Sequence, residues 1–149
     1  MYITQYCLLG KIEDANTWND KGNSLYSLGR HEEAIACCDE AIKLDPENSG
    51  AWNNKGDSLR SLGRHEEAIA CCDKAIQLDR KYSGAWNNKS NSLSKLGEHK
   101  EAIACCDEAI KLDPKYSTAW SNKGDSLKKL GRDEDAEQCF AKAKELDES

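Results

Sequence analysis

A 34-residue repeat constrains this 149-residue chain more than any other feature. The segment 49–82 recurs, with edits, from Ala15 to Ser149. Four residue types return in the same phase: Trp18, Trp52, Trp86 and Trp120; Leu25, Leu59, Leu93 and Leu127; Gly29, Gly63, Gly97 and Gly131; and Ala34, Ala68, Ala102 and Ala136. Self-similarity at such a period indicates an array of one supersecondary unit, here repeated over 15–48, 49–82, 83–116 and 117–149.

Each copy contains two helical patterns separated by a glycine, the residue that most often ends a helix in a left-handed conformation. At about 100° per residue, Trp52 and Leu59 fall on the core side of the first helix of the second copy. In the second helix, Ile69 and Ile76 stand to one side, where only a following copy can cover them. The pattern predicts an all-α protein with about eight repeat helices.

The first copy resembles the tetratricopeptide (TPR) repeat family at its characteristic places, through Trp18, Gly22, Ala34, Ala41 and Pro46. The resemblance covers about nine-tenths of the chain, as a single TPR domain over 15–149. It implies an α-solenoid in which antiparallel helix pairs form a right-handed superhelix. It also implies a concave groove lined by the first helices, and binding of protein segments rather than catalysis.

Several positions depart from the pattern of the family. Cysteine stands where a large aromatic residue is usual, at Cys38, Cys72 and Cys106, and only Phe140 keeps one; Ser90 replaces a glycine, Arg80 replaces a proline, and lysine occupies a commonly apolar place at Lys21, Lys55, Lys89 and Lys123. The missing proline weakens the prediction of a helix end near Arg80. We expect the lysine stems to lie along the core edge with their ammonium groups in water.

The charge balance argues against a nucleic-acid partner, because 27 acidic residues exceed 21 basic ones and give a net charge of −6. The first ten residues have no basic start, long apolar stretch or cleavage site, so we expect no signal peptide, no membrane span and a cytoplasmic location. Residues 1–14 precede the first copy. Tyr2, Tyr6 and Leu9 share a helical face, which leaves two interpretations open: a degenerate capping helix or a disordered lead-in.

Six of the eight cysteines occur as adjacent pairs, at positions 37–38, 71–72 and 105–106. Adjacent helical cysteines point about 100° apart and cannot form a disulfide without distortion. We therefore expect buried, reduced thiols, with a metal or redox role as the alternative. His31, His65 and His99 open the second helices, and each lies too far from its repeat's second cysteine to share a metal ion through adjacent contact. We expect no enzyme, cofactor or metal site.

The first helices carry an unusual number of asparagines and aspartates on the face opposite the core: Asn19, Asp20 and Asn23; Asn53, Asn54 and Asp57; Asn87, Asn88 and Asn91; and Ser121, Asn122 and Asp125. Such residues are poor helix formers, so their recurrence favours a function. A carboxamide can pair with both the C=O and the N–H of a peptide unit. Asn54, Asn88 and Asn122 resemble the asparagine ladder in the TPR domain of the O-linked N-acetylglucosamine transferase. The alternative is a solvated polar face.

A second TPR binding mode, the clamp for the C-terminal carboxylate of chaperone tails, fits less well. Asn23 and Asn54 match two of its positions, but Asn19, Gly84 and Asn88 stand where the clamp has basic residues. Basic residues instead increase along the groove, where Tyr26 and Ser27 of repeat one give way to Arg60, then Lys95, then Lys128 and Lys129. We therefore expect an acidic ligand segment near repeats three and four. The predicted binding residues are Asn19, Asn23, Asn53, Asn54, Asp57, Arg60, Asn87, Asn88, Asn91, Lys95, Asn122, Asp125, Lys128 and Lys129.

The fourth copy differs on its outer face, where Glu137 and Lys144 replace the isoleucines of the other copies. A polar outer face is typical of a terminal repeat. The predicted function is a protein-interaction module that binds an extended partner segment in its groove. Two alternatives stay open: a scaffold that associates weakly with copies of itself through its repeat ends, and a cysteine-rich metal store.

Overall fold

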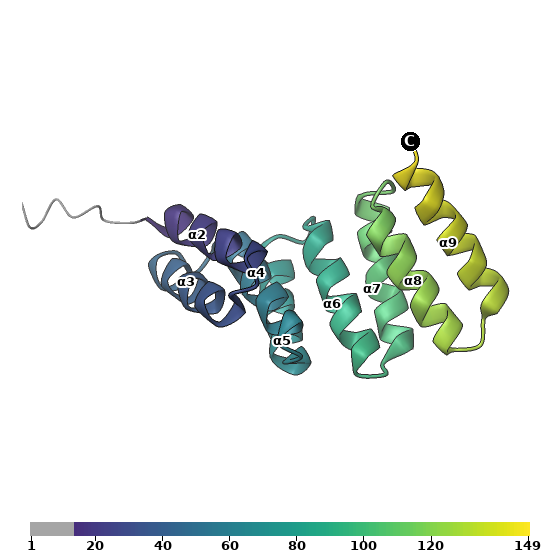
Figure 1. Cartoon of the computed structure of the whole chain (residues 1–149), viewed down its shortest axis with the longest axis horizontal. Coiled ribbons are helices and arrows are strands. Elements are labelled where there is room, and N and C mark those ends of the chain that lie inside the picture. Colours follow the sequence, from purple (N-terminus) through teal and green to yellow (C-terminus); the bar gives the residue numbers. More distant parts are fainter. Residues whose placement is uncertain (1–13) are drawn as a thin grey trace, which may run out of the picture.

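The computed structural model describes residues 14–149, which fold into eight α-helices and contain no strand (Figure 1). The helices are α2 (Ala15–Ser27), α3 (His31–Leu44), α4 (Ser49–Ser61), α5 (His65–Leu78), α6 (Ser83–Lys95), α7 (His99–Leu112), α8 (Ser117–Lys129) and α9 (Asp133–Asp147). This confirms the predicted all-α array of helix pairs. The predicted lead-in or capping helix falls on residues 1–13, outside the described residues, and on Asp14, which is the N-cap of α2.

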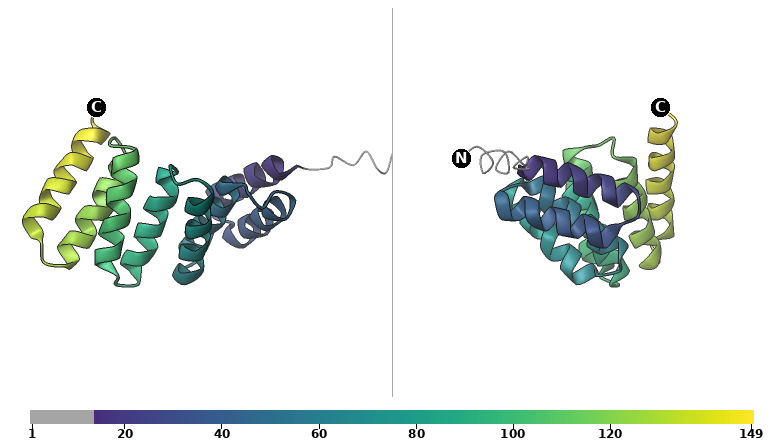
Figure 2. Two further views of the ribbon diagram at one scale, coloured as in Figure 1. Left: turned by 180° about the vertical axis from the view of Figure 1, so that it is seen from behind. Right: turned by 60° about the vertical axis from the view of Figure 1, so that its left-hand side comes forward.

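The helices pack in chain order, each pair against the next (Figure 2). Successive first helices also touch one another: α2 contacts α4, α4 contacts α6 and α6 contacts α8. Within residues 14–149, the backbones of the second helices α3, α5, α7 and α9 lie farther apart than those of the first helices, and only side chains bridge them. The array therefore curves toward its first helices, which line the concave side, and it forms the expected α-solenoid.

Each pair turns at a glycine with a positive φ, at Gly29, Gly63, Gly97 and Gly131. In the third repeat, where φ is 85°, the Glu98 N–H donates to the Leu93 carbonyl at 2.9 Å and the Gly97 N–H donates to the Ser94 carbonyl at 3.1 Å. These bonds satisfy carbonyls that the end of a helix leaves free. The predicted role of the glycines as helix terminators is confirmed.

An aspartate ends the second helix of each of the first three repeats. The carboxylates of Asp45, Asp79 and Asp113 accept the backbone N–H two residues later, at 3.0 to 3.1 Å. Because Asp79 makes this bond as the others do, α5 ends at Leu78, at the place where α3 ends at Leu44. The proline that Arg80 replaces is therefore not needed to end this helix.

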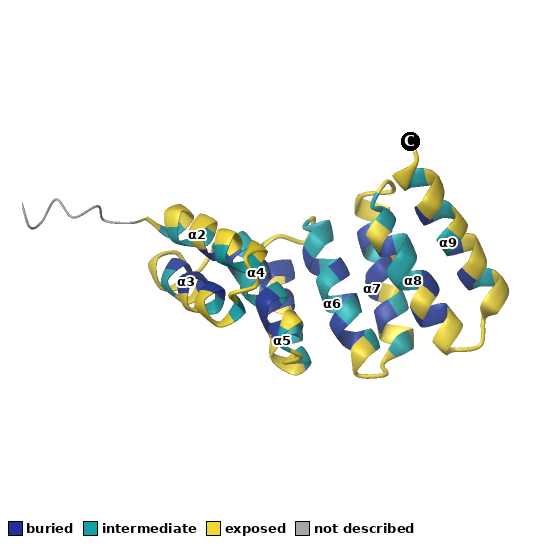
Figure 3. Ribbon diagram, viewed as in Figure 1, coloured by how far each residue is buried: buried dark blue, intermediate teal, exposed yellow. Residues whose placement is uncertain are grey.

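Buried residues recur in every helix pair of the array (Figure 3). Ile35 packs on Leu59, Ala68 and Cys71 of the following repeat, and Ile69 and Ile103 occupy the same place at the next two interfaces. Each isoleucine is thus covered by the next copy, as the sequence predicted. The outer face of α9, by contrast, exposes Glu137 and Lys144.

A tryptophan connects each of the first helices α4, α6 and α8 to the turn before it. The indole N–H of Trp52 donates to the Pro46 carbonyl at 2.9 Å, and Trp86 makes the equivalent bond to the Arg80 carbonyl at 3.1 Å. Trp120 repeats the bond at Pro114, also at 3.1 Å. The half-buried ring therefore contributes both apolar contact and a hydrogen bond between repeats.

Cysteine packs closely against the facing small residue at the place where the family has an aromatic residue. A Cβ placed on Gly56 would lie 3.1 Å from the Cys72 sulfur and 3.2 Å from the Ala68 carbonyl oxygen. The third repeat accepts Ser90 there, and its hydroxyl donates to the Asn87 carbonyl at 2.7 Å. Helices of one repeat thus approach closely through a small residue on one side and a thiol on the other.

We expected the lysines at the commonly apolar place to hold their ammonium groups in water. Three of them instead form ion pairs. Lys55, Lys89 and Lys123 each pair with an aspartate of the preceding repeat, at 2.6 Å. Their side chains are only 23 to 24% exposed, against 50 to 52% for the partners Asp39, Asp73 and Asp107. The lysines are therefore part of the contact between repeats.

No helix between residues 14 and 149 has the length and apolar character needed to cross a lipid bilayer.

Candidate functional site

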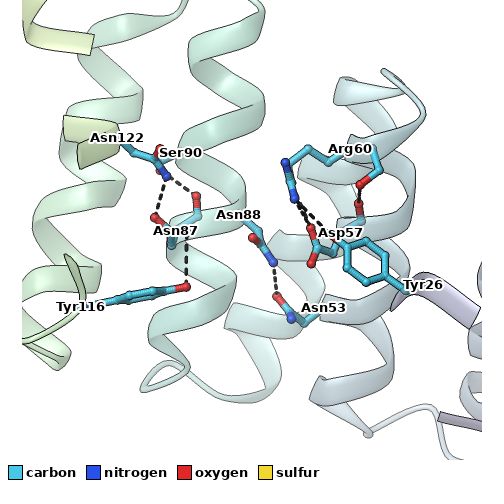
Figure 4. A network of polar contacts seen from close by, with 10 residues as sticks. Tyr26, Asn53, Asp57, Arg60, Asn87, Asn88, Ser90, Tyr116 and Asn122 are labelled. Atoms are coloured by element: carbon cyan, nitrogen blue, oxygen red, sulfur yellow. Dashed lines mark hydrogen bonds and ion pairs between the residues drawn. The ribbon is translucent and has the colours of Figure 1, made fainter. Parts of the chain in front are cut away.

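A row of asparagine pairs runs along the concave side and crosses each boundary between the repeats. Figure 4 shows the pairs at the second and third boundaries. The Asn54 side-chain N–H donates to the Asn19 carboxamide oxygen at 2.9 Å. The same bond joins Asn88 to Asn53 at 3.1 Å and Asn122 to Asn87 at 2.9 Å. Each pair links one first helix to the preceding first helix, so the carboxamides are held in a fixed orientation.

Tyrosines continue this row at two interfaces. Asn53 donates to the Tyr82 hydroxyl at 3.2 Å, and Asn87 donates to the Tyr116 hydroxyl at 3.3 Å. Burial raises the pKa of both tyrosines, so they stay protonated at neutral pH. Asn53 and Asn87 are only 7% and 5% exposed. Our expectation that both lie on a solvent face was wrong, because these hydrogen bonds satisfy their polar atoms away from water.

Arg60 lies on the groove side of the second repeat and is held by contacts within the protein. Arg60 forms an ion pair with Asp57, one turn earlier on α4, and its guanidinium also reaches the Tyr26 hydroxyl at 3.4 Å. Both members of the ion pair are about one-quarter exposed. Arg60 is therefore engaged within the protein, although the sequence suggested that it faces a ligand.

A pocket of about 690 Å³ opens farther along the same face, between α6 and α8. Its walls are formed by Asn91, Ser94, Lys95, Gly97, His99, Asn122, Asp125, Lys128 and Lys129. Six of these were predicted as binding residues: Asn91, Lys95, Asn122, Asp125, Lys128 and Lys129. Sequence reasoning missed Ser94 and His99, whose Oγ and Nδ1 atoms lie 3.4 Å apart.

The pocket is positively charged and holds an unsatisfied acceptor. Lys95, Lys128 and Lys129 make no ion pair within residues 14–149, in contrast to Lys55, Lys89 and Lys123. The side-chain oxygen of Asn91 is buried and has no hydrogen-bond donor in the same part of the chain. A ligand that supplied negative charge would pair with the lysine ammonium groups.

Three sequence profiles of the tetratricopeptide repeat match this chain, over residues 19–84, 83–116 and 105–138. The chain belongs to the tetratricopeptide repeat family. The matched segments together run from the first repeat into the fourth.

Solved structures of other TPR proteins share the fold. The crystal structure of MamA superposes with a TM-score of 0.82 at 23% identity, covering 97% of this chain and 84% of that one. TTC0263, a thermophilic TPR protein of Thermus thermophilus, gives 0.83 at 20% identity, covering 91% and 75%. The first TPR of Spaghetti (RPAP3), bound to the HSP90 peptide SRMEEVD, gives 0.76 at 23% identity, covering 80% and 98%.

The other predicted binding residues of this TPR array lie outside the α6–α8 pocket. Asn19, Asn53, Asn54, Asn87 and Asn88 belong to the asparagine row, whereas Asp57 and Arg60 pair with each other. Asn23 is exposed at the N-terminal end of the groove. The groove thus has a carboxamide row along its length and one open, basic pocket near its C-terminal end.

The cysteines lie away from this groove surface, in the contacts between helices. Cys38, Cys72 and Cys106 are fully buried reduced thiols. Burial raises the pKa of Cys38 and Cys72 to about 12 and that of Cys106 to about 11. Among residues 14–149, no group of His, Cys, Asp and Glu side chains has an arrangement that could hold a metal ion.

Proposed function

We propose that this TPR array is a protein-interaction module that holds an extended segment of a partner protein in its concave groove. The observation that carries the proposal is the asparagine row, which repeats at each boundary between first helices. The fold relationship to the first TPR of Spaghetti (RPAP3), bound to an HSP90 peptide, supports binding of a peptide. We infer that the module acts by binding rather than by catalysis.

The bonds within the row prepare the outer asparagines for a ligand. Asn54, Asn88 and Asn122 each commit one N–H to the preceding repeat. Each keeps a second N–H and a carboxamide oxygen, which accepts no hydrogen bond from residues 14–149. Those two groups can pair with the C=O and N–H of a peptide unit. Asn19, Asn53 and Asn87 act as positioning residues, because they fix the orientation of the neighbouring carboxamide.

The distribution of charge in the groove favours a partner segment that is acidic in one part. Arg60 is neutralised by Asp57 in the second repeat, whereas Lys95, Lys128 and Lys129 have no carboxylate partner within residues 14–149 around the α6–α8 pocket. Complementary charge favours an acidic stretch of the ligand there. The peptide bound to the first TPR of Spaghetti (RPAP3), SRMEEVD, is itself acidic toward its C-terminal end.

Burial of reduced thiols supports a reducing compartment as the place of action, and we infer the cytoplasm.

Selection from a display library of random twelve-residue peptides, followed by calorimetry, tests the function. Asn54→Ala combined with Asn88→Ala should weaken all selected peptides alike, by at least about tenfold, because each change removes contacts to backbone groups that every sequence has. Asn16→Ala, a change at the start of α2 and away from the row, is the control. Unchanged affinity in the double variant would show that the asparagines serve only the contact between repeats.

A further inference from the structure

The wall of the open pocket includes two positions at which repeat three differs from repeat two. Asp57 and Arg60 of repeat two correspond to Asn91 and Ser94 of repeat three. Arg60 pairs with Asp57 and reaches the Tyr26 hydroxyl. Ser94 is short and Asn91 is uncharged, and both line the 690 Å³ pocket. Repeat three therefore has an open version of this part of the groove, without the ion pair of repeat two.

The open version has also gained positive charge. Lys95 stands where repeat two has Ser61, and Lys128 and Lys129 stand where repeat one has Tyr26 and Ser27. Three lysines and one aspartate, Asp125, line the pocket, which leaves two positive charges in excess, from three minus one. Since none of the three ammonium groups has a carboxylate partner in the described part of the chain, they are available to a ligand.

Polar groups in the wall add directional requirements. The buried Asn91 oxygen needs an N–H donor. The Ser94 hydroxyl accepts from Ser126 at 3.3 Å and lies beside His99, so it is held in place. Asn122 is fixed by its bond to Asn87, at 2.9 Å. The pocket thus offers concentrated positive charge beside polar side chains that are held in place.

We propose that this pocket receives a compact dianion carried by the bound segment, an inference that rests on the groove binding proposed above. The dianion is either a phosphorylated serine or threonine side chain or a pair of adjacent carboxylates. A phosphomonoester carries about −1.5 to −2 at neutral pH, and lysine recognises such a group as a point charge. Lys95, Lys128 and Lys129 hold the anion. Recognition of the partner would then depend on its phosphorylation state or on an acidic pair.

Three acetylated and amidated tetrapeptides test the inference on the full chain: Ala-phosphoSer-Ala-Ala, Ala-Glu-Glu-Ala and Ala-Ser-Ala-Ala. Binding is followed by amide chemical shifts in two-dimensional NMR, at low and at high salt. We expect at least one dianionic peptide to bind at least tenfold more tightly than the neutral one, with shifts at Asn91, Asn122 and Lys128. Tighter binding of the phosphopeptide identifies a phosphorylated partner, and equal or tighter binding of the glutamate peptide identifies an acidic segment.

Two variants use residues that the chain already carries at equivalent positions. Asn91→Asp with Ser94→Arg copies repeat two and adds an internal ion pair and a large side chain to the pocket wall; Lys128→Tyr with Lys129→Ser copies repeat one and removes charge. Each should lower dianion affinity at least tenfold. The control, Lys81→Ser with Lys115→Ser, removes two lysines outside the pocket and should change the dianion affinity by less than twofold. Thermal unfolding verifies that all variants fold.

The inference is overturned if the neutral peptide binds as well as both dianions. It is also overturned if the control pair lowers affinity as much as the pocket variants do. The groove proposal is judged separately, by the effect of Asn54→Ala and Asn88→Ala on selected peptides. A dianion site can therefore fail while the asparagine row still binds a peptide backbone.

Discussion

Cys72 illustrates how single residues set the properties of this array. Its side chain is fully buried between α4 and α5, and burial raises its pKa to about 12, from an ordinary value of 9.0. A thiolate is nucleophilic and a thiol is not. Cys72 is therefore expected to be inert toward thiol reagents at neutral pH for as long as the repeat stays folded.

The raised pKa of Cys72 also predicts a loss of stability in alkali. Below pH 9 the thiol is protonated in both the folded and the unfolded chain. Between pH 9 and pH 12 only the unfolded chain loses the proton, so the unfolded state is favoured, by about 1 kcal/mol at pH 10. Cys72→Ala lacks this titration. Its deficit in unfolding free energy, measured with denaturant, should therefore shrink by about that amount from pH 8 to pH 10; a constant deficit would contradict the buried, protonated thiol.

Trp86 should be among the residues most sensitive to truncation. Its ring packs against Ile76 and Ala85 and against Leu93, and its indole N–H bonds to the Arg80 carbonyl. Trp86→Ala removes these contacts and should cost about 3 to 5 kcal/mol. Chemical denaturation measures the loss. Lys100→Ala, on an exposed turn of α7, serves as a control and should change stability by less than about 0.5 kcal/mol.

At the scale of the helix, the turn between α6 and α7 depends on a backbone conformation rather than on packing. Gly97 has a φ of 85°, and a Cβ added there would meet no atom within 4 Å. Gly97→Ala should therefore cost about 1 kcal/mol through strain alone, lowering the melting temperature by about 3 °C. Calorimetry of Gly97→Ala and Gly97→Asn distinguishes backbone strain from a packing effect. Asparagine tolerates the positive φ better than alanine does, so it should recover part of the loss if strain is the cause.

The lysine–aspartate pairs join neighbouring elements, and their contribution can be measured at the middle interface. Lys89 of α6 and Asp73 of α5 lie 2.6 Å apart, with the lysine side chain 23% exposed. A double-mutant cycle with Lys89→Met and Asp73→Asn should give a coupling of up to about 1 kcal/mol, which falls as salt is added. A coupling of zero at low salt would mean that the lysine contributes only through the apolar part of its side chain.

The helix pairs and their ends could be predicted from the sequence because they depend on local rules. Glycine in a fixed phase and isoleucine on one side of the second helix were sufficient to place them. The asparagine row could not be foreseen in full, since the bond from Asn88 to Asn53 joins residues 35 apart whose relation depends on how two repeats stack. Arg60 and Ser94 occupy the same position in their repeats, and the sequence shows this. Only the structure shows that Arg60 is engaged by an ion pair with Asp57.

For the whole molecule, the polar outer face of α9 is expected to limit association. Restoring the isoleucines of the other repeats, as Glu137→Ile with Lys144→Ile, exposes an apolar strip that a further repeat would cover. We expect this variant to associate as its concentration rises, whereas Glu137→Gln with Lys144→Gln should behave as the parent does. Analytical ultracentrifugation at several concentrations decides the matter, and a parent that already associates strongly would contradict the capping role.

Every boundary between repeats uses the same contacts: an asparagine pair on the inner side, a lysine–aspartate pair toward the outer side, and an isoleucine between them. A copy of residues 49–82 inserted after Tyr82 would therefore meet a matching surface at both of its ends. Loss of one internal copy would leave a matching boundary too. By duplication or deletion of whole units, evolution can lengthen or shorten this groove without inventing a new interface, while changes of any other length would disrupt it.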